Sequence, residues 1–239
     1  MTPTKLLDIV IISYAKDDYC KGLTENCIKS ILVSEKYAES LFNVIVVESE
    51  HGVKWEHLSE IVHTFEAPIP YGYHKFLNFG RKSGKSEWVA LCNNDLEFTK
   101  GWFSNMIKAS VENPDTLSFS PICPRTQPMY GIFENSGYYK GYNIRKEISG
   151  WCIVQKRDIY KIIGDLDERF HHWFCDNDYS MELQYHGLSH ILVTDSVVVH
   201  HDKNIGKTTE RVVTDPNQMH EMTMGSQPIF IEKWKNKIR

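Results

Sequence analysis

The sequence predicts an α/β fold in a single domain. The chain opens with two continuous apolar runs, residues 7–14 and 42–47, and an amphipathic segment lies between them. Continuous apolar runs rich in β-branched residues are typical of strands buried on both faces of a parallel sheet. The 239 residues, 41% of them hydrophobic and 24% charged, show no internal repeat and no linker. One domain with a sizeable core is therefore the expected organisation.

The first elements form a strand–helix–strand unit. Leu7 to Tyr14 (LDIVIISY) predicts the first strand, and Phe42 to Val47 (FNVIVV) predicts the second. Between them, Asp17 to Lys36 predicts a helix, because its apolar residues recur at helical spacing. These residues are Leu23, Cys27, Ile28, Ile31 and Leu32. Such a unit is expected to be right-handed, with both strands parallel in one sheet.

The ends of these strands indicate where a ligand binds. In open α/β sheets, ligands collect beyond the carboxyl ends of the strands. Ser13 and Tyr14 end the first strand, whereas Glu48 and Ser49 follow the second. We therefore expect these residues to lie beside one another at a ligand crevice.

The middle of the chain continues the alternation of helices and strands. Residues 74–85 (HKFLNFGRKSGK) predict a helix that ends at a glycine, and Trp88 to Cys92 (WVALC) predicts a third buried strand. Residues 100–112 predict another helix. Residues 113–148 are rich in Pro, Gly, Tyr and Asn, which predicts strands joined by long loops.

The last part of the chain contains fewer regular elements. Residues 149–156 predict a strand, and residues 157–163 predict a short helix. Asp176 to His186 predicts a helix that ends at Gly187, and Ile191 to His200 (ILVTDSVVVH) predicts the last strand. Beyond that strand the chain is polar and irregular until a short amphipathic end (IFIEKWKNKIR).

Composition and charge exclude several classes of function. The formal net charge of -4 gives no global basic field for a nucleic-acid partner. The opening apolar run is too short for a signal peptide or a membrane span. The cysteines form no C-x-x-C pair, which argues against a structural zinc site or a disulfide framework. They are Cys20, Cys27, Cys92, Cys123, Cys152 and Cys175. We expect a soluble protein of a reducing compartment, the cytoplasm.

A candidate metal site follows the third strand. Asn93, Asn94 and Asp95 place a carboxylate between a strand end and a turn. A carboxylate flanked by amides can hold a hard divalent cation and leave its other positions to water and phosphate oxygens. Because Asn and Asp also dominate turns, a simple cap between strand and turn is the competing interpretation.

Two further polar clusters are candidates for chemistry. Asp176 and Asp178 precede or begin a helix, where they can cap its positive end or offer a carboxylate to a neighbouring site. The cap is the favoured interpretation for Asp178, whereas both interpretations stay open for Asp176. His200 and His201 end the last strand, where adjacent side chains point to opposite faces. At most one of these histidines is therefore expected to face a metal site.

Taken in chain order, these segments resemble family 2 glycosyltransferases, in particular the rhamnosyltransferase-like branch. IVIISYAKDD looks like the strand and loop that hold the donor base, and VIVVES is similar to the partner segment V-V-D-N-x-S. YGYHKFLNFGRKSGKSEWVALCNND resembles the run G-(x)n-N-x-G-(x)n-A-x-G-(x)n-L-N-x-D. The matching positions are Asn78, Gly80, Gly84, Asn93 and Asp95.

The resemblance continues to the end of the chain. SGWCIVQKRDIYKIIGDLDERF resembles a segment that ends in G-x-x-D-E-x-F, with matches at Gly164, Asp167, Glu168 and Phe170. CDNDYSMELQYHG resembles E-D-x-D-(x)n-R-(x)n-G, VVVHH resembles V-x-H, and IFIEKW resembles F-x-x-K-W. Two departures concern the acceptor half: Cys175 replaces the Glu of E-D, and Glu182 or Leu183 replaces the basic residue.

The resemblance implies the GT-A fold, with a mixed sheet flanked by helices in one domain. It assigns residues 1–100 to nucleotide-sugar binding, residues 101–201 to the acceptor and catalytic half, and residues 202–239 to a C-terminal tail. It further implies that Asp95 binds Mg²⁺ or Mn²⁺ across the two phosphates of the donor. His200 is the expected second ligand and His201 the alternative, and an imidazole ligand favours Mn²⁺.

The resemblance also implies roles in catalysis and donor binding. Asp176 is expected to be the general base on the acceptor hydroxyl, in a transfer that inverts the anomeric centre. Tyr14 would offer its ring to the nucleobase, and Glu48 would accept hydrogen bonds from the base or the ribose. The expected donor-site residues are Ser13, Tyr14, Glu48, Asn78, Arg81, Asn93 and Asn94.

Alternatives remain for the activity and for the acceptor. A nucleotidyltransferase would normally have a glycine-rich phosphate loop after the first strand, and ISYAKDDYC lacks its glycines. A catalytically silent nucleotide- or sugar-binding module is the other alternative. The acceptor is expected to be a surface glycan or a hydroxymethylated base of viral DNA, which the aromatic and basic residues of 125–146 would contact. Uridine, thymidine and guanosine diphosphate sugars are all open as donors.

Overall fold

The computed structural model describes residues 5–201, 213–235 and 237, and they form an α/β structure as the sequence predicts. The elements of the first half are β1 (Leu7–Ser13), α1 (Asp18–Ser34), α2 (Ala38–Leu41), β2 (Phe42–Glu48), β3 (Val62–Glu66), α3 (Tyr73–Ser83), β4 (Trp88–Cys92) and β5 (Leu96–Phe98). Those of the second half are α4 (Trp102–Glu112), β6 (Ser118–Ile122), η1 (Gln127–Tyr130), β7 (Tyr138–Lys140), β8 (Cys152–Lys156), η2 (Arg157–Ile159), α5 (Tyr160–Ile163), α6 (Cys175–Tyr185), β9 (His190–His200), α8 (Pro216–Met224) and α9 (Gln227–Trp234).

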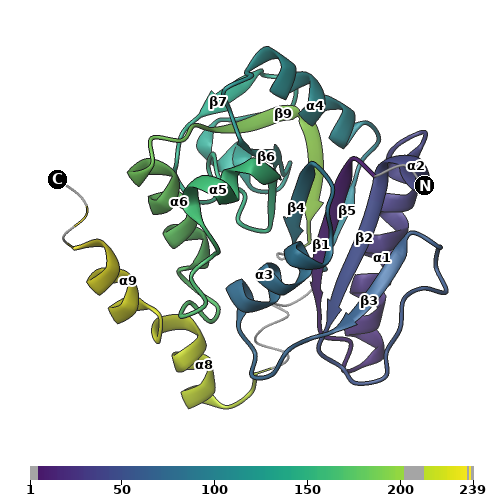
Figure 1. The fold of residues 1–239 in the computed structure, drawn as a ribbon, viewed down its shortest axis with the longest axis vertical. Coiled ribbons are helices and arrows are strands. Elements are labelled where there is room, and N and C mark those ends of the chain that lie inside the picture. Colours follow the sequence, from purple (N-terminus) through teal and green to yellow (C-terminus); the bar gives the residue numbers. More distant parts are fainter. Residues whose placement is uncertain (1–4, 202–212, 236, 238–239) are drawn as a thin grey trace.

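A mixed sheet of nine strands joins both halves of the described chain. Its order is β3-β2-β1-β4-β8-β6-β9-β5, and β7 pairs with β9 (Figure 1). Strands β1 to β4 pair in parallel, as the strand–helix–strand pattern predicts. Strand β8 is antiparallel to both β4 and β6, which makes the sheet mixed. Because β5 also pairs with β9, the residues just before β5 lie beside the end of the last strand.

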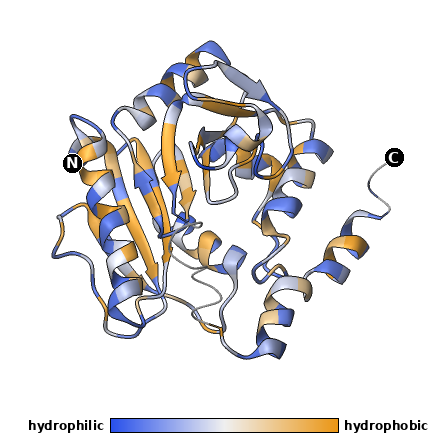
Figure 2. Cartoon of the chain, turned by 180° about the vertical axis from the view of Figure 1, so that it is seen from behind, coloured by the Kyte–Doolittle hydropathy of each residue, from blue (hydrophilic) through white to orange (hydrophobic). Residues whose placement is uncertain are grey.

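Helices cover both faces of the sheet, and the alternation of side chains along each strand supplies both cores. In β1, Leu7, Ile9 and Ile11 belong to the core cluster under α1 and α4. Val10 points the other way, into the cluster that includes residues of α3 and α6. The central strands are accordingly coloured hydrophobic along most of their length (Figure 2). Each fully buried aliphatic side chain of this kind contributes about 1.5–3 kcal/mol to stability.

The structure confirms the first strand–helix–strand unit and the predicted neighbourhood at its strand ends. Ser13 lies opposite Glu48 in the register of β1 and β2. The Ser49 amide donates a hydrogen bond of 3.0 Å to the Ser13 carbonyl. Helix α1 starts after Asp17, whose carboxylate accepts a hydrogen bond of 2.8 Å from the Cys20 amide. Such a cap stabilises a helix by about 1 kcal/mol.

The expected cap at the start of α6 is wrong. The N-cap position is Phe174, which makes no side-chain capping bond, and the helix begins at Cys175. Asp176 and Asp178 therefore lie inside the first turn, where the helix dipole still favours a negative charge. Asp178 is 1% exposed and accepts hydrogen bonds from Lys233 and Trp234.

The described chain resumes at Val213 and contains the last two helices. Of the predicted C-terminal tail, residues 202–212 lie outside the described residues. Helices α8 and α9 then pack beside the loop that precedes α6 (Figure 1). Among the described residues, none of the helices is both long and apolar enough to cross a membrane.

Candidate active site

Hydrogen bonds to Glu48 hold the carboxyl ends of β1 and β2 together at one side of the candidate site. Glu48 is 1% exposed. Its Oε1 accepts hydrogen bonds from the amides of Ala15 (2.9 Å) and Glu50 (2.8 Å), and its Oε2 accepts one from Trp55 Nε1 (3.0 Å). Glu48 thus fixes the loop after β1 from within the protein. Tyr14, one residue before Ala15, is 41% exposed and keeps an accessible ring at this edge of the sheet.

Hydrogen bonds link the end of β1 to the loop after β4. Ser13 Oγ lies 2.8 Å from Thr24 Oγ1, and Asn94 Nδ2 donates to the same Thr24 oxygen at 2.9 Å. Asn93 Oδ1 accepts a hydrogen bond of 2.8 Å from the Tyr73 hydroxyl. The backbone amide of Asn93 donates a hydrogen bond of 2.9 Å to the Trp151 carbonyl. The amide side chains of Asn93 and Asn94 therefore hold the loop in place, next to Asp95.

Asp95 and His200 meet because their strands are paired. Leu96, the first residue of β5, lies opposite His200 at the end of β9. Asp95 Oδ1 is 3.3 Å from His200 Nε2, and the two side chains are 12% and 10% exposed. Within the described part of the chain, no donor makes a hydrogen bond of good geometry to Asp95 Oδ1. A buried carboxylate oxygen in this state is typical of a functional or ligand-binding position.

The His201 side chain, directly after β9, has partners other than Asp95. Its Nε2 is 3.0 Å from Glu97 Oε2, and its Nδ1 is 3.0 Å from Arg125 Nη1. Its backbone amide also donates to the Asp95 carbonyl at 3.1 Å. The structure therefore brings His200, and not the side chain of His201, to Asp95.

Trp151 is a site residue that the sequence argument missed. Its indole stacks on the imidazole of His200, with ring centroids 4.9 Å apart and an interplanar angle of 10°. The stack fixes the plane of the His200 ring, since a rotation of the imidazole would break it. Trp151 lies in an apolar segment next to β8, and its side chain is buried. Nothing in the sequence pattern separates such a tryptophan from an ordinary core residue.

Asp176 lies next to the same segment, against Gly150. Gly150 packs directly against it: a Cβ built on Gly150 would lie 2.8 Å from Asp176 Oδ2 and 3.0 Å from its Cβ. A side chain at position 150 would therefore displace the carboxylate. Gly150 contacts Asp176 and the next residue, Trp151, stacks on His200, so this short segment connects the two candidate groups.

The environment of Asp176 shifts its acidity. Burial raises the pKa of Asp176, and the helix amides of Asn177 and of Asp176 itself act in the opposite direction, as does the Arg145 guanidinium. The Asn177 amide donates to Asp176 Oδ1 at 2.9 Å. A carboxylate with a raised pKa at the edge of a pocket is a candidate for proton transfer.

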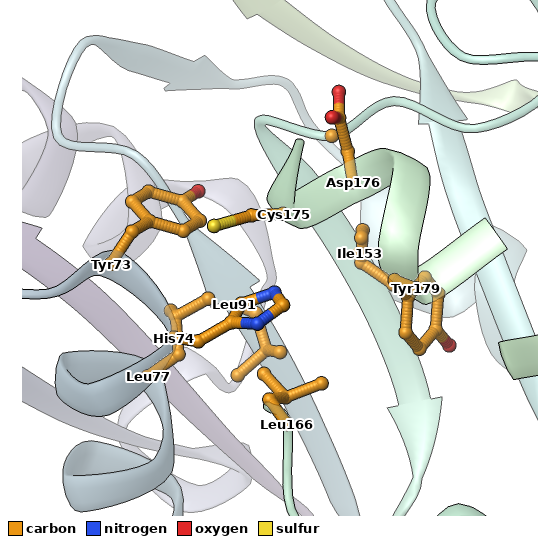
Figure 3. A pocket seen from close by; sticks show the side chains of 10 residues that line it. Tyr73, His74, Leu77, Leu91, Ile153, Leu166, Cys175, Asp176 and Tyr179 are labelled. Carbon is orange, nitrogen blue, oxygen red and sulfur yellow. The ribbon is translucent and has the colours of Figure 1, made fainter. Parts of the chain in front are cut away.

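A small pocket adjoins Asp176, which is one of its lining residues. Its wall includes Tyr73, His74 and Cys175 together with apolar side chains of both halves (Figure 3). The thiol of Cys175 points toward Tyr73, whereas the carboxylate of Asp176 points away from the apolar wall (Figure 3). Tyr73 was not predicted from the sequence as a site residue, although its hydroxyl connects this pocket to Asn93.

Asn78 and Arg81 lie in a different network, inside the protein. Asn78 Nδ2 donates to the Leu166 carbonyl (2.8 Å) and to Glu168 (3.0 Å). Arg81 pairs with Asp165 and stacks on the ring of Tyr160 at 3.7 Å. The structure therefore assigns these two side chains to the contact between α3 and the loop of residues 164–168, and it does not bring them to Asp95.

The donor set at Asp95 fits a divalent cation. A carboxylate oxygen and an imidazole nitrogen lie side by side, and the carboxylate oxygen has no other partner among the described residues. No group of three or more His, Cys, Asp or Glu side chains that could hold a metal is found in the described residues. Two protein ligands suit a cation that shares its coordination sphere with water and phosphate oxygens.

Comparisons with known proteins bear on the fold. No protein-family model matches the sequence, and no curated protein matches it. The chain is similar to the crystal structure of GalNAc-T7 with UDP, GalNAc and Mn²⁺, with a TM-score of 0.60 and 12% identity over 81% of this chain and 42% of that one. It is also similar to the mannosyltransferase PcManGT from Pyrobaculum calidifontis with GDP-Man and Mn²⁺, with a TM-score of 0.66 and 16% identity over 88% and 61%.

The chain spans less than two thirds of the length of either of these structures. At such identities the likeness establishes the fold and not the substrate. Both neighbours are glycosyltransferases, and both structures hold Mn²⁺ and a nucleotide or nucleotide sugar. The chain has the fold of the GT-A glycosyltransferases, with one mixed sheet between two layers of helices.

Proposed function

We propose that the chain is a metal-dependent glycosyltransferase that moves a sugar from a nucleotide-diphosphate donor to an acceptor hydroxyl, with inversion of the anomeric centre. The motifs of the sequence further support a place in family 2, close to the rhamnosyltransferase-like branch. The observation that carries the proposal is the pair Asp95 and His200, 3.3 Å apart in a GT-A fold. Beside it, Gly150 and Trp151 bridge to Asp176.

Asp95 and His200 would hold the cation. When bound there, Mn²⁺ or Mg²⁺ would neutralise the charge that develops on the leaving diphosphate. Asn93 and Asn94 keep Asp95 in place through Tyr73 and Thr24. Because the carboxylate and the imidazole are already side by side and nearly buried, little reorganisation is needed when the donor arrives.

Asp176 would accept the proton of the acceptor hydroxyl. Its Oδ2 lies against Gly150, at the edge of the pocket that Tyr73 and Cys175 line. Burial raises its pKa toward the range in which a carboxylate is an effective general base. The attack opposite the leaving group would invert the anomeric carbon. On the donor side, the 41% exposed ring of Tyr14 is free to stack on a nucleobase at the carboxyl end of β1.

The first experiment is a thermal-shift screen of UDP, GDP, dTDP and their sugars, with and without Mn²⁺. A ligand at about 100 times its Kd adds about 2.7 kcal/mol to the apparent stability. We expect one nucleotide to raise the melting temperature only when Mn²⁺ is present, and Asp95→Ala to abolish this shift. Asp176→Asn should keep the shift and lose turnover by about 100- to 10,000-fold.

The two variants test different parts of the proposal. If Asp95→Ala keeps the full Mn²⁺-dependent shift, the metal site is elsewhere. If Asp176→Asn turns over at the wild-type rate, Asp176 is not the base. If no nucleotide shifts the wild type at any Mn²⁺ concentration, the chain is not a nucleotide-sugar transferase.

A further inference from the structure

The C-terminal clasp, which we define as residues 213–235 with helices α8 and α9, packs on the segment that carries Asp176 (Figure 1). From its contacts we infer that Lys233 is a positioning residue: it fastens the clasp to α6 and so holds the first turn of that helix, with Asp176, in its place. The inference rests on the proposed role of Asp176 as the general base.

Lys233 gathers three carboxylates that come from two parts of the chain. Its Nζ lies 2.8 Å from Asp178 Oδ1, 2.9 Å from Glu182 Oε1 and 3.2 Å from Asp167 Oδ2. The Lys233 side chain is only 9% exposed. Asp178 and Glu182 belong to α6, whereas Asp167 precedes it. Such a buried ion cluster depends on the positive charge of Lys233, because the three carboxylates would otherwise repel one another.

Trp234 reinforces the same contact. Its indole Nε1 donates a hydrogen bond of 2.8 Å to Asp178 Oδ1, and the side chain is 2% exposed. Its ring also meets Tyr185 at the far end of α6, with centroids 6.0 Å apart. Consecutive residues of α9 therefore bind Asp178, two residues after Asp176 in the first turn of α6.

The clasp also holds the loop directly before α6. The Trp173 amide donates to the Met222 carbonyl at 3.3 Å, and the His171 amide donates to Ser226 Oγ at 3.4 Å. Between these residues and Asp176 stands Phe174, whose backbone is left-handed with φ of 68°. A bulky residue adopts that conformation only where its surroundings impose it. The ring of Phe174 packs against Phe230 of α9, with centroids 5.6 Å apart.

These contacts make the direction of Asp176 depend on the clasp. Phe174 sets the angle at which α6 starts, and Asp176 follows it by two residues. The ion pairs, the Trp234 hydrogen bond and the ring contacts of α9 reach residues 167–185, and none of these contacts involves Asp95 or His200. Loss of the Lys233 ion pairs should therefore displace Asp176 and leave Asp95 and His200 in place.

The test compares Lys233→Met with Lys233→Arg and Arg157→Met in the 239-residue chain. Arg157 pairs with Asp8, which is 1% exposed and lies near the start of β1, so Arg157→Met removes a second ion pair remote from Asp176. The first measurement is the Kd of UDP or GDP in the presence of Mn²⁺, by calorimetry. The second is turnover, followed as the nucleotide released from its sugar when methyl glycosides serve as acceptors. Hydrogen exchange of residues 171–178 by mass spectrometry is the third measurement.

We expect Lys233→Met to lower kcat about 10- to 100-fold, as for a displaced catalytic group, while the Kd of the nucleotide with Mn²⁺ stays within about twofold of wild type. Amide exchange of residues 171–178 should accelerate in Lys233→Met only. Lys233→Arg should restore much of kcat, and Arg157→Met should keep it despite a lower melting temperature. Unchanged exchange or unchanged kcat in Lys233→Met overturns the inference. A wild type that neither binds nor turns over a nucleotide sugar overturns the proposed function instead, and the exchange measurement then still decides whether Lys233 holds this segment.

Discussion

At the scale of single residues, the stack of Trp151 on His200 is the contact that most clearly separates this site from a chance pair of polar side chains. An imidazole on a strand end can rotate about two side-chain bonds, and only some rotamers bring Nε2 to Asp95. Trp151 covers one face of the ring at 4.9 Å and is itself buried. Residues that orient a metal ligand in this way commonly change metal affinity by about 10- to 100-fold when they are lost.

We therefore predict that Trp151→Leu weakens Mn²⁺ binding by about tenfold, because the His200 ring loses its fixed plane. Trp151→Phe keeps an aromatic face and should lose much less. Mn²⁺ binding can be measured by electron paramagnetic resonance of the free ion, without any donor or acceptor. Equal affinities in the three proteins would mean that the stack does not orient His200 for a metal.

At the residue scale the sequence predicted some of these positions and not others. Asp95 and His200 were assigned through the resemblance to family 2, since their local patterns also fit a turn and an ordinary strand end. Their contact also needs the pairing of β5 with β9, and a strand as short as LEF gives no clear periodic signal. Trp151 and Tyr73 could not be found, since both look like core aromatics and their roles depend on contacts between distant segments.

At the scale of secondary-structure elements, buried parallel strands were the most predictable part. β1, β2 and β4 are continuous apolar runs, and the structure places all three next to one another. β3 was not predicted, because VHTFE is neither a continuous apolar run nor a regular alternation of apolar and polar residues. The start of α6 was misjudged for a different reason: the left-handed Phe174 is imposed by packing against Phe230, which no local pattern contains.

Helix α3 joins the two halves of the site through its first residue. The hydroxyl of Tyr73 donates to Asn93 Oδ1 at 2.8 Å, and its ring lines the pocket beside Cys175. Burial raises the pKa of Tyr73 well above its ordinary value, so the hydroxyl stays a neutral donor at physiological pH. The loop of residues 93–95 thus depends on the position of α3.

We predict that Tyr73→Phe weakens Mn²⁺-dependent nucleotide binding several-fold, because one hydrogen bond of about 1 kcal/mol that holds the loop before Asp95 is lost. The ring remains, so the melting temperature should change little. Tyr142→Phe is the matched control, since the Tyr142 hydroxyl donates to the Leu188 carbonyl at 3.0 Å and not to residues 93–95. The Kd of the nucleotide with Mn²⁺ is measured by calorimetry for both variants. Equal effects would show that the Tyr73 hydroxyl does not hold the loop before Asp95.

At the scale of the whole molecule, stability should depend on buried histidines outside the metal pair. His74 on α3 and His190 on β9 are 2% and 1% exposed. Burial lowers the pKa of His74 to about 4 and that of His190 to about 3, and backbone carbonyl partners only partly oppose this. Both rings are therefore neutral in the folded protein, and His190 is bonded to Ser118 and to the Glu147 carbonyl.

This arrangement predicts a loss of stability in mild acid. Below the ordinary histidine pKa of 6.5 the unfolded chain binds protons that the folded chain does not, so unfolding becomes more favourable as the pH falls toward 4. Each ring lowers the free energy of unfolding by about 1.4 kcal/mol per pH unit, so both together lower it by about 3 kcal/mol per pH unit. Asp176 and Asp178 act in the opposite direction, since burial raises their pKa, whereas Asp165 and Asp167, whose pKa values are lowered, add to the loss of stability as the pH falls further.

Urea unfolding at pH 7.5, 6.5, 5.5 and 5.0 measures this dependence without any knowledge of the substrate. The free energy of unfolding should begin to fall near pH 7 and should drop by a few kcal/mol between pH 6.5 and 5.0. His190→Asn should reduce the slope of the free energy of unfolding against pH by the equivalent of about one bound proton. Substitution of the exposed His57 by Gln should leave this slope as in wild type. A free energy of unfolding that stays level down to pH 5 would show that both rings can take up protons in the folded state. The buried surroundings of His74 and His190, and with them the packing of α3 and β9 around the site, would then differ from those described.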